Sequence, residues 1–356
     1  VTHPRAVTVV ERLCGASLVH HLDSCVVSRA PHRQTALARL HYKMQQSALL
    51  LALALGATSA FTRPAQRAAS LLHRRAGEDG PKAGAYLEKD AEGLYYVALE
   101  HESGASAKIF VFGADVTSYK DADGTEWVAV RPDAKMDGSK PISGGLSHCF
   151  PQFGPGAIQQ HGFGRNVDWD IVATKGSSAT FRLSPSAYSK AMWDEPFVAD
   201  FTVSLTAASL DTTMNVQNTG SGGPFDFQAA LHSYFDVSSL ENVSIEGSFE
   251  GATYLDKLAD PPADKTEARS AIVVSEEYDR VYKGTNDPVL VDSAKGKKLV
   301  IDNKRGWKDT VLWSPYGDEG MGFDSFLCVE SVAFEPVTLA AGDSWVGELS
   351  LVPEKI

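Results

Sequence analysis

The sequence predicts an all-β protein, a large β-sandwich that forms a single domain and has few short helices. Past residue 77, the apolar segments are short, and turn-forming residues interrupt them roughly every 8–12 residues. Within the segments, apolar and polar residues alternate with a period of two, as they do in a strand with one buried face. No segment carries a sustained apolar stripe with the period of a helix.

The expected strands follow one another along the body of the chain. In chain order they lie in residues 93–101, 107–119, 124–132, 197–224, 224–237 and 343–353. Residues 275–284 have room for one helical turn at most. Neither an internal repeat nor a linker divides residues 80–356, so we expect one domain there.

The N-terminal part of the chain is expected to lie outside that domain. Residues 44–60 contain a short apolar run followed by small residues, which is typical of a secretory signal peptide and too short to span a bilayer. Residues 61–79 form a transit-peptide-like segment, since their first sixteen residues carry arginine and serine but no acid. Residues 1–43 are interpreted as a non-native extension of the gene model.

The two targeting segments together resemble the bipartite presequence of algae with secondary plastids. In such presequences a phenylalanine follows the signal cleavage point, and Phe61 occupies that position here. The resemblance implies localisation in a plastid, and secretion is the alternative.

The charge distribution excludes two classes of partner. Residues 1–77 hold ten of the 33 Lys and Arg but only two of the 45 Asp and Glu, which leaves 23 basic and 43 acidic side chains in residues 78–356. A body with a net charge of −20 is unsuited to nucleic acid, because phosphate contacts need clustered cations. It is equally unsuited to stable association with an anionic membrane.

The cysteine pattern indicates neither a disulfide framework nor a metal site. Cys149 and Cys328 are the two cysteines of the body, and we expect both to be buried thiols. No Cys and His spacing resembles a zinc site, so we expect no metal.

Two titratable residues stand out in the apolar segments. If residues 224–237 form a strand, His232 shares its polar face with Gln228 and Tyr234. The core face then holds Phe225, Phe227, Ala229, Leu231 and Phe235. Glu330 lies in an otherwise apolar or small run, where a carboxylate is either at a strand end or partly desolvated with a raised pKa. Together they would form a general acid–base pair, although each alone also fits a structural role.

A series of motifs runs in order from residue 144 to residue 351. They are GGLSHCFPQFG (144–154), QQHGFGRNVDWDI (159–171), LHSYFDV (231–237), GATYLDK (251–257), EEYDRVY (276–282), VLWSPY (311–316), MGFDSFLCVES (321–331) and LAAGDSWVGELSL (339–351). In this order they resemble the hexose-6-phosphate mutarotases, or glucose-6-phosphate 1-epimerases, of the aldose 1-epimerase superfamily. The resemblance covers residues 94–352.

The resemblance implies the galactose-mutarotase-like β-sandwich and the interconversion of the α and β anomers of a hexose phosphate, without a cofactor. The reaction opens the pyranose ring, rotates the aldehyde and closes the ring again. Opening requires a proton given to the ring oxygen and a proton taken from the anomeric hydroxyl. By motif match, His232 is the acid and Glu330 is the base, and they exchange roles on closure. A histidine that titrates near physiological pH suits this task.

The same match implies the residues that bind the substrate. Gln160, His161 and Arg165 would present polar groups to the sugar hydroxyls and the phosphate, since arginine suits phosphate through its planar fork of donors. Asp256 would accept hydrogen bonds from sugar hydroxyls. The pair Gly144–Gly145 is expected to bring backbone close to the ligand, with simple turn geometry as the alternative.

One position departs from the family pattern. Family members usually carry arginine where this chain has Ser143, and that arginine helps to hold the phosphate. Loss of such a charge-assisted contact weakens binding by about 1.5–3 kcal/mol. Lys140 is close in sequence and is the expected substitute, although it offers a point charge and not a fork.

The substrate and the activity therefore have alternatives. The substrate is expected to be a small-molecule sugar phosphate, and an aldose 1-epimerase acting on unphosphorylated sugar is the alternative. A non-catalytic carbohydrate-binding module is a third reading, which the presence of both His232 and Glu330 disfavours. We expect a monomer.

Overall fold

The computed structural model describes residues 83–356. The predictions for residues 1–43, 44–60 and 61–79 concern segments outside the described residues. Within residues 83–356, no helix is both long enough and apolar enough to cross a membrane.

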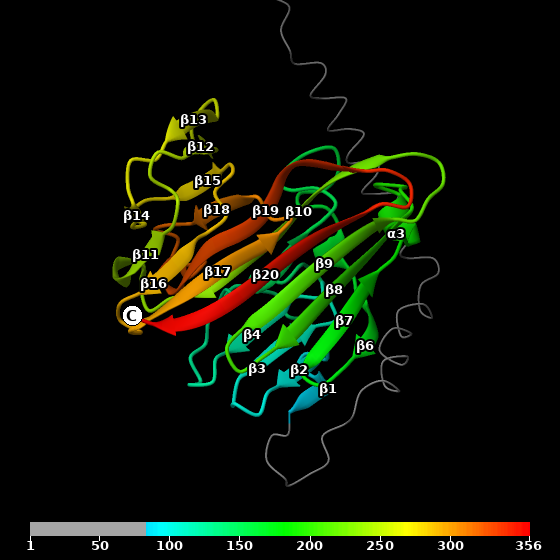
Figure 1. Ribbon diagram of the computed structural model, residues 1–356, viewed down its shortest axis with the longest axis horizontal. Helices are drawn as coiled ribbons and strands as arrows, with labels where there is room; N and C mark the ends of the chain where they lie inside the picture. Colours follow the sequence, from blue (N-terminus) through cyan, green and yellow to red (C-terminus); the bar gives the residue numbers. More distant parts are fainter. Residues whose placement is uncertain (1–82) are drawn as a thin grey trace, which may run out of the picture. The chain divides into compact units, whose positions relative to one another are not determined.

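The described chain folds into two antiparallel β-sheets, seen as two layers in Figure 1. The first sheet has eleven strands, in the spatial order β1 (Gly84–Lys89), β2 (Tyr95–Glu100), β3 (Ser106–Phe110), β4 (Val116–Lys120), β5 (Leu146–Cys149), β10 (Phe225–Asp236), β19 (Phe326–Leu339), β18 (Asp309–Ser314), β15 (Tyr278–Tyr282), β12 (Thr253–Asp256) and β13 (Ala263–Thr266). The second sheet has nine, in the order β14 (Ala271–Ile272), β11 (Val243–Glu246), β16 (Val289–Asp292), β17 (Lys297–Arg305), β20 (Ser344–Lys355), β9 (Leu210–Asn218), β8 (Phe197–Leu205), β7 (Ser178–Leu183) and β6 (Asp170–Thr174).

Helices are few among residues 83–356, as the sequence predicts. They are the single α-helical turn α3 (Ala187–Lys190) and the 3-10 helices η1 (Gly164–Asn166), η2 (Leu240–Asn242) and η3 (Phe323–Ser325). The prediction of an all-β sandwich is therefore confirmed. Residues 275–284 hold the strand β15 in place of a helical turn.

The core lies between the sheets because the strands alternate in polarity. In β8 every second residue from Phe197 to Leu205 is buried, and β9 pairs with it and shows the same alternation. The turn between them closes where the Thr206 N–H donates to the Ser209 carbonyl at 2.9 Å. Each large apolar side chain buried in this way contributes about 1.5–3 kcal/mol.

The strand β10 lies between β5 and β19 and positions the functional site. Its predicted core face, which holds Phe225, Phe227, Ala229, Leu231 and Phe235, belongs to the main core cluster. The opposite face is also covered, since every residue from Ala230 to Phe235 is buried. The loop after β5 covers part of that face, and the Gln228 N–H donates to the Pro151 carbonyl at 2.8 Å. The polar face of β10 therefore forms the floor of a partly enclosed space.

The glycine pair before β5 allows the chain to approach itself closely. Gly144 pairs with Val130 across an isolated antiparallel bridge, and a Cβ at Gly144 would lie 2.5 Å from the Val130 Cα. A Cβ at Gly145, whose φ is +72°, would lie 2.0 Å from Oδ1 of Asp115. These contacts support the alternative of local chain geometry for both glycines, because the neighbour that requires glycine is the protein itself. The two glycines thus allow residues 129–131 to lie directly beside residues 143–145.

Candidate active site

A cavity of about 280 Å³ lies over the polar face of β10. This volume is close to the lower limit of the roughly 300–1,000 Å³ of ligand pockets, so it suits a small ligand. The side chains that line it are mostly polar or charged, namely Arg131, Ser143, Phe153, Gln160, His161, Arg165, His232, Tyr234, Lys257, Asp279, Val311, Trp313 and Glu330. Five of the six predicted site residues are therefore brought together, and Asp256 is not among them.

His232 and Glu330 face each other across two neighbouring strands. Leu231 of β10 pairs with Ser331 of β19, so the next antiparallel pair places His232 opposite Glu330 on the cavity face. Nε2 of His232 lies 3.5 Å from Oε1 of Glu330, and their side chains are only 10% and 2% exposed. This distance exceeds that of an ordinary hydrogen bond, so each group can turn to a substrate oxygen.

The surroundings of this pair favour its uncharged form. Burial lowers the pKa of His232 well below its ordinary value, and the nearby charges of Arg165 and Lys257 act in the same direction. Burial also raises the pKa of Glu330 well above its ordinary value, with a further contribution from Asp279. Both shifts favour a neutral His232 beside a protonated Glu330 over the ion pair.

His161 is held as a neutral hydrogen-bond donor. Its φ is +65°, a left-handed conformation that is uncommon outside glycine and is often found at functional sites. Its Nδ1 accepts from the Gly154 N–H at 3.2 Å and lies 3.0 Å from Sγ of Cys149. Burial lowers the pKa of His161 to about 3, so the neutral ring carries its proton on Nε2.

The protonated Nε2 of His161 identifies the orientation of Gln160. The structure places Nε2 of the Gln160 amide 3.3 Å from this nitrogen. Because two N–H donors do not pair, we assign the opposite amide orientation, in which the oxygen accepts from His161. The His161 and His232 rings meet edge to face with centroids 5.5 Å apart. His161 thus offers an N–H beside the acid–base pair.

Three cations line the cavity. Arg165 lies in η1, and its buried Nε has no hydrogen-bond partner among the described residues. Lys257 follows β12 and is held by both carboxylate oxygens of Asp279, at 2.8 and 2.9 Å. Arg131 binds Asp133 through Nε at 2.9 Å and Nη2 at 2.6 Å. This set of donors suits an anionic ligand.

Sequence reasoning did not assign roles to Arg131, Lys257 or Asp279. Arg131 is the second-to-last residue of the predicted strand 124–132, and nothing in the sequence distinguishes it from a surface cation. Lys257 and Asp279 lie within recognised motifs, Lys257 as the last residue of GATYLDK and Asp279 inside EEYDRVY. The signal available was the charge in those motifs, but only the pairing of β12 with β15 brings the two together.

Asp256 and Lys140 lie away from the cavity lining. The Asp256 carboxylate accepts from Nζ of Lys265 at 2.6 Å and from the Leu258 N–H at 3.1 Å. The bond from Lys265 lowers the pKa of Asp256 below its ordinary value. Lys140 is exposed, which leaves the predicted substitute for an arginine at position 143 outside the cavity.

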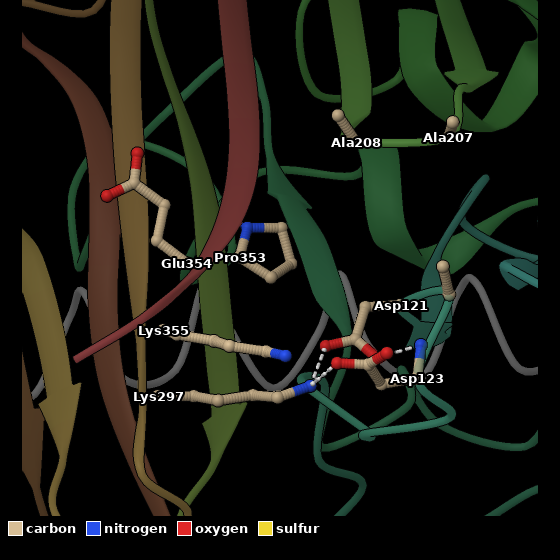
Figure 2. Close-up of a pocket in the computed structure, with 9 residues that line it drawn as sticks. Asp121, Asp123, Ala207, Ala208, Lys297, Pro353, Glu354 and Lys355 are labelled. Carbon is tan, nitrogen blue, oxygen red and sulfur yellow. Dashed lines mark hydrogen bonds and ion pairs between the residues drawn. The ribbon is translucent and has the colours of Figure 1, made fainter.

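A second cavity, of about 150 Å³, is drawn in Figure 2. Asp121 and Asp123 both point at Nζ of Lys297, at 2.8 and 3.1 Å. Lys297 therefore pairs with both carboxylates, and Glu354 and Lys355 also line this cavity. Within residues 83–356, no group of three or more His, Cys, Asp or Glu is arranged to hold a metal ion.

Comparison with known proteins agrees with this geometry. The family model described as aldose 1-epimerase matches residues 95–352. A protein of Cenchrus ciliaris, provisionally named glucose-6-phosphate 1-epimerase, is 32% identical over 292 residues, which cover 76% of this chain and 88% of that protein. An Escherichia coli protein with the same provisional name is 28% identical over 256 residues, covering 67% of this chain and 83% of the relative.

Solved structures share the fold. A provisionally assigned mutarotase from Salmonella typhimurium superposes with a TM-score of 0.67 at 21% identity, covering 82% of this chain and 99% of that one. A galactose mutarotase-like protein from Clostridium acetobutylicum gives a TM-score of 0.64 at 17% identity, covering 77% and 99%. The two-sheet architecture is therefore that of the galactose mutarotase-like proteins.

Proposed function

The chain belongs to the aldose 1-epimerase family and is an isomerase, and from this premise we propose that it interconverts the α and β anomers of a hexose 6-phosphate. The observation that carries the proposal is the pair His232 and Glu330, 3.5 Å apart in a cavity that three cations line. The acid–base pair supplies the chemistry, and the cations supply the preference for a phosphorylated sugar.

The proposed reaction begins with ring opening. His232 donates a proton to the ring oxygen while Glu330 accepts the proton of the anomeric hydroxyl. The free aldehyde then rotates about the C1–C2 bond, and the ring closes on the other face with the two residues exchanging roles. No atom is gained or lost, so the reaction needs only one mobile proton on the pair.

That proton must be on His232 before opening, whereas burial favours its place on Glu330. We propose that it crosses the 3.5 Å between Nε2 and Oε1, aided by the negative charge of the bound phosphate, which favours a protonated histidine. The pair then titrates as one unit, and activity depends on its total protonation rather than on either residue alone.

The charge of the cavity supports a phosphorylated substrate. Among the cations that line the cavity, Arg131 is paired with Asp133 and Lys257 with Asp279, while the buried Nε of Arg165 has no hydrogen-bond partner among the described residues. Burial raises the pKa of Glu330 and so disfavours its negative charge. The excess of positive charge suits a phosphate, which charge-assisted hydrogen bonds hold strongly. The provisional names of the Cenchrus ciliaris and Escherichia coli relatives point to the same substrate.

Anomer exchange measured by NMR on glucose 6-phosphate and on glucose, with and without the protein, tests the proposal. We expect a much higher kcat/KM for the phosphate ester. Equal or greater acceleration for free glucose would identify an epimerase of unphosphorylated sugar. Binding of either sugar without acceleration would identify a carbohydrate-binding module.

A further inference from the structure

Residues 131 and 143 are direct neighbours across a short antiparallel contact. Val130 pairs with Gly144, and the Arg131 N–H donates to the Ser143 carbonyl at 2.9 Å. Residues opposite one another in such a pair have Cβ atoms about 4.5–5.5 Å apart. Both side chains line the cavity, so a guanidinium carried by either position reaches the same end of it.

The guanidinium of Arg131 is positioned and still has donors for an anion. Its Nε and Nη2 form a two-pronged bond with Asp133, whose side chain is 48% exposed, while that of Arg131 is only 12% exposed. A guanidinium has five N–H donors, so this bond fixes the plane of the group and leaves others for a ligand. Asp133 therefore orients the cation at the edge of the cavity.

Arg131 lies to one side of the acid–base pair. Its neighbour in the cavity is Tyr234, whose ring stacks on His232 with centroids 4.8 Å apart. Burial raises the pKa of Tyr234 well above its ordinary value, and the charge of Arg131 opposes that rise. The phosphate of a hexose 6-phosphate is bound through O6 to C6, and C6 is attached to C5, which lies across the ring oxygen from C1. A phosphate-binding cation must therefore lie beside the pair and not between its members.

The other two cations have different surroundings. Arg165 lies in η1 with its Nε buried, and its charge, like that of Lys257, lowers the pKa values of both His232 and Glu330. Lys257 has three donors, and Asp279 engages its nitrogen through both oxygens. Arg131 thus places a planar fork of donors beside Ser143 in the cavity. At position 143 the family resemblance leads us to expect an arginine.

We propose that Arg131 binds the phosphate in this protein and sets its selectivity for a phosphorylated hexose, in place of an arginine at position 143. The inference rests on the proposed function. It replaces the expectation that Lys140 compensates for Ser143, and it predicts that the guanidinium can be moved across the contact without loss of selectivity.

The test compares wild type with Arg131→Ser, with the exchanged double variant Arg131→Ser/Ser143→Arg, and with the exposed-site control Lys140→Ser. The KM and kcat of each are measured on glucose 6-phosphate and on glucose. Arg131→Ser should raise the KM for the phosphate ester about 10–100-fold with little change in kcat, since phosphate contacts act on ground and transition states alike. The double variant should recover most of that loss, and Lys140→Ser should resemble wild type.

Each outcome separates the inference from the proposed function. If wild type does not prefer glucose 6-phosphate, the proposed substrate is wrong. If wild type prefers it but Arg131→Ser keeps its KM, the inference alone is wrong. Equal losses on both sugars without recovery in the double variant would assign Arg131 a structural role only, which also overturns the inference, and thermal melting of each variant accompanies the kinetics.

Discussion

Nε2 of His232 and Oε1 of Glu330 lie 3.5 Å apart on adjacent strands, in side chains that are almost fully buried. Nδ1 of His232 and Oε2 of Glu330 receive no hydrogen bond from the described residues. A buried polar atom without a hydrogen-bond partner lowers the free energy of unfolding by about 1–3 kcal/mol, so these atoms destabilise the fold. Such a cost is typical of catalytic groups whose partners are substrate atoms.

Removal of either member of the pair should abolish most of the turnover. His232→Ala and Glu330→Gln should each lower kcat by a factor of about 10²–10⁴, because each moves a proton in the transition state. The double variant should be little worse than either single variant, since the two residues act as a unit. Anomer exchange on glucose 6-phosphate measures all three, and circular dichroism checks their folding. A single variant with near wild-type kcat would contradict the role of that residue.

The two aspartates of the β12–β15 region should have different effects on the pH profile. The charge of Asp279 adds to the effect of burial in raising the pKa of Glu330. Asp279→Asn should therefore lower that pKa, and the alkaline limb of kcat/KM, where the pair loses its proton, should move to lower pH. The matched variant Asp256→Asn should leave this limb in place, because Lys265 holds that carboxylate outside the cavity lining.

A profile from pH 5 to pH 9 with the same substrate for all proteins decides the matter, because the titration of the substrate phosphate is then common to them. A shift with Asp256→Asn but not with Asp279→Asn would return the site role to Asp256, as the motif match implied. Equal shifts would mean that neither effect is specific to the cavity.

The alternation of residues in β10 was sufficient to predict the face on which His232 lies. Strand geometry alone sends residues 225, 227, 229, 231 and 235 to the core, and it therefore sends His232 away from it. The opposition of His232 and Glu330 needed the register of β10 against β19, which short-range patterns do not contain. The pairing of His232 with Glu330 was instead predicted from the match to the family motifs.

Arg131 and Asp279 show what the sequence could not supply. Arg131 reaches the cavity because Val130 pairs with Gly144. The turn residues between these two segments do not by themselves predict this pairing. Asp279 reaches it through the pairing of β15 with β12 and β18. The lowered pKa of His232 could not be predicted either, since it depends on burial and on the charges of residues far away in sequence, such as Arg165 and Lys257.

The N-terminal segments lead to a prediction about location. We propose that residues 44–80 direct the protein to a secondary plastid, since a signal-like run precedes an acid-free segment that begins with Phe61. A fluorescent fusion of residues 44–80 should enter the plastid of a heterokont-type alga, and Phe61→Arg should divert it to an earlier secretory compartment. Microscopy of the two fusions measures this, and uniform cytosolic fluorescence of the first would refute it.

The raised pKa of Glu330 also has a consequence for stability. Below pH 4.5 both the folded and the unfolded chain hold the proton on this group, and it costs nothing. Above that value the unfolded chain loses the proton, while burial makes the folded chain retain it. The contribution of Glu330 to the free energy of unfolding therefore decreases as the pH rises from 4.5 to the folded pKa. The depressed pKa of His232 acts in the opposite direction and lowers stability as the pH falls below 6.5.

Glu330→Gln should therefore be more stable than wild type at neutral pH, although it is nearly inactive. Glutamine keeps the shape but does not titrate, so the difference in Tm should be small at pH 4.5 and should grow towards pH 8. Each unit by which the pKa is raised is worth about 1.4 kcal/mol, and each kcal/mol moves the Tm of a domain of this size by about 2–4 °C. Differential scanning calorimetry across this range measures the difference, with Glu335→Gln as an exposed control. A Tm difference that stays constant with pH would mean that Glu330 is ionised in the folded protein and that the neutral pair does not exist.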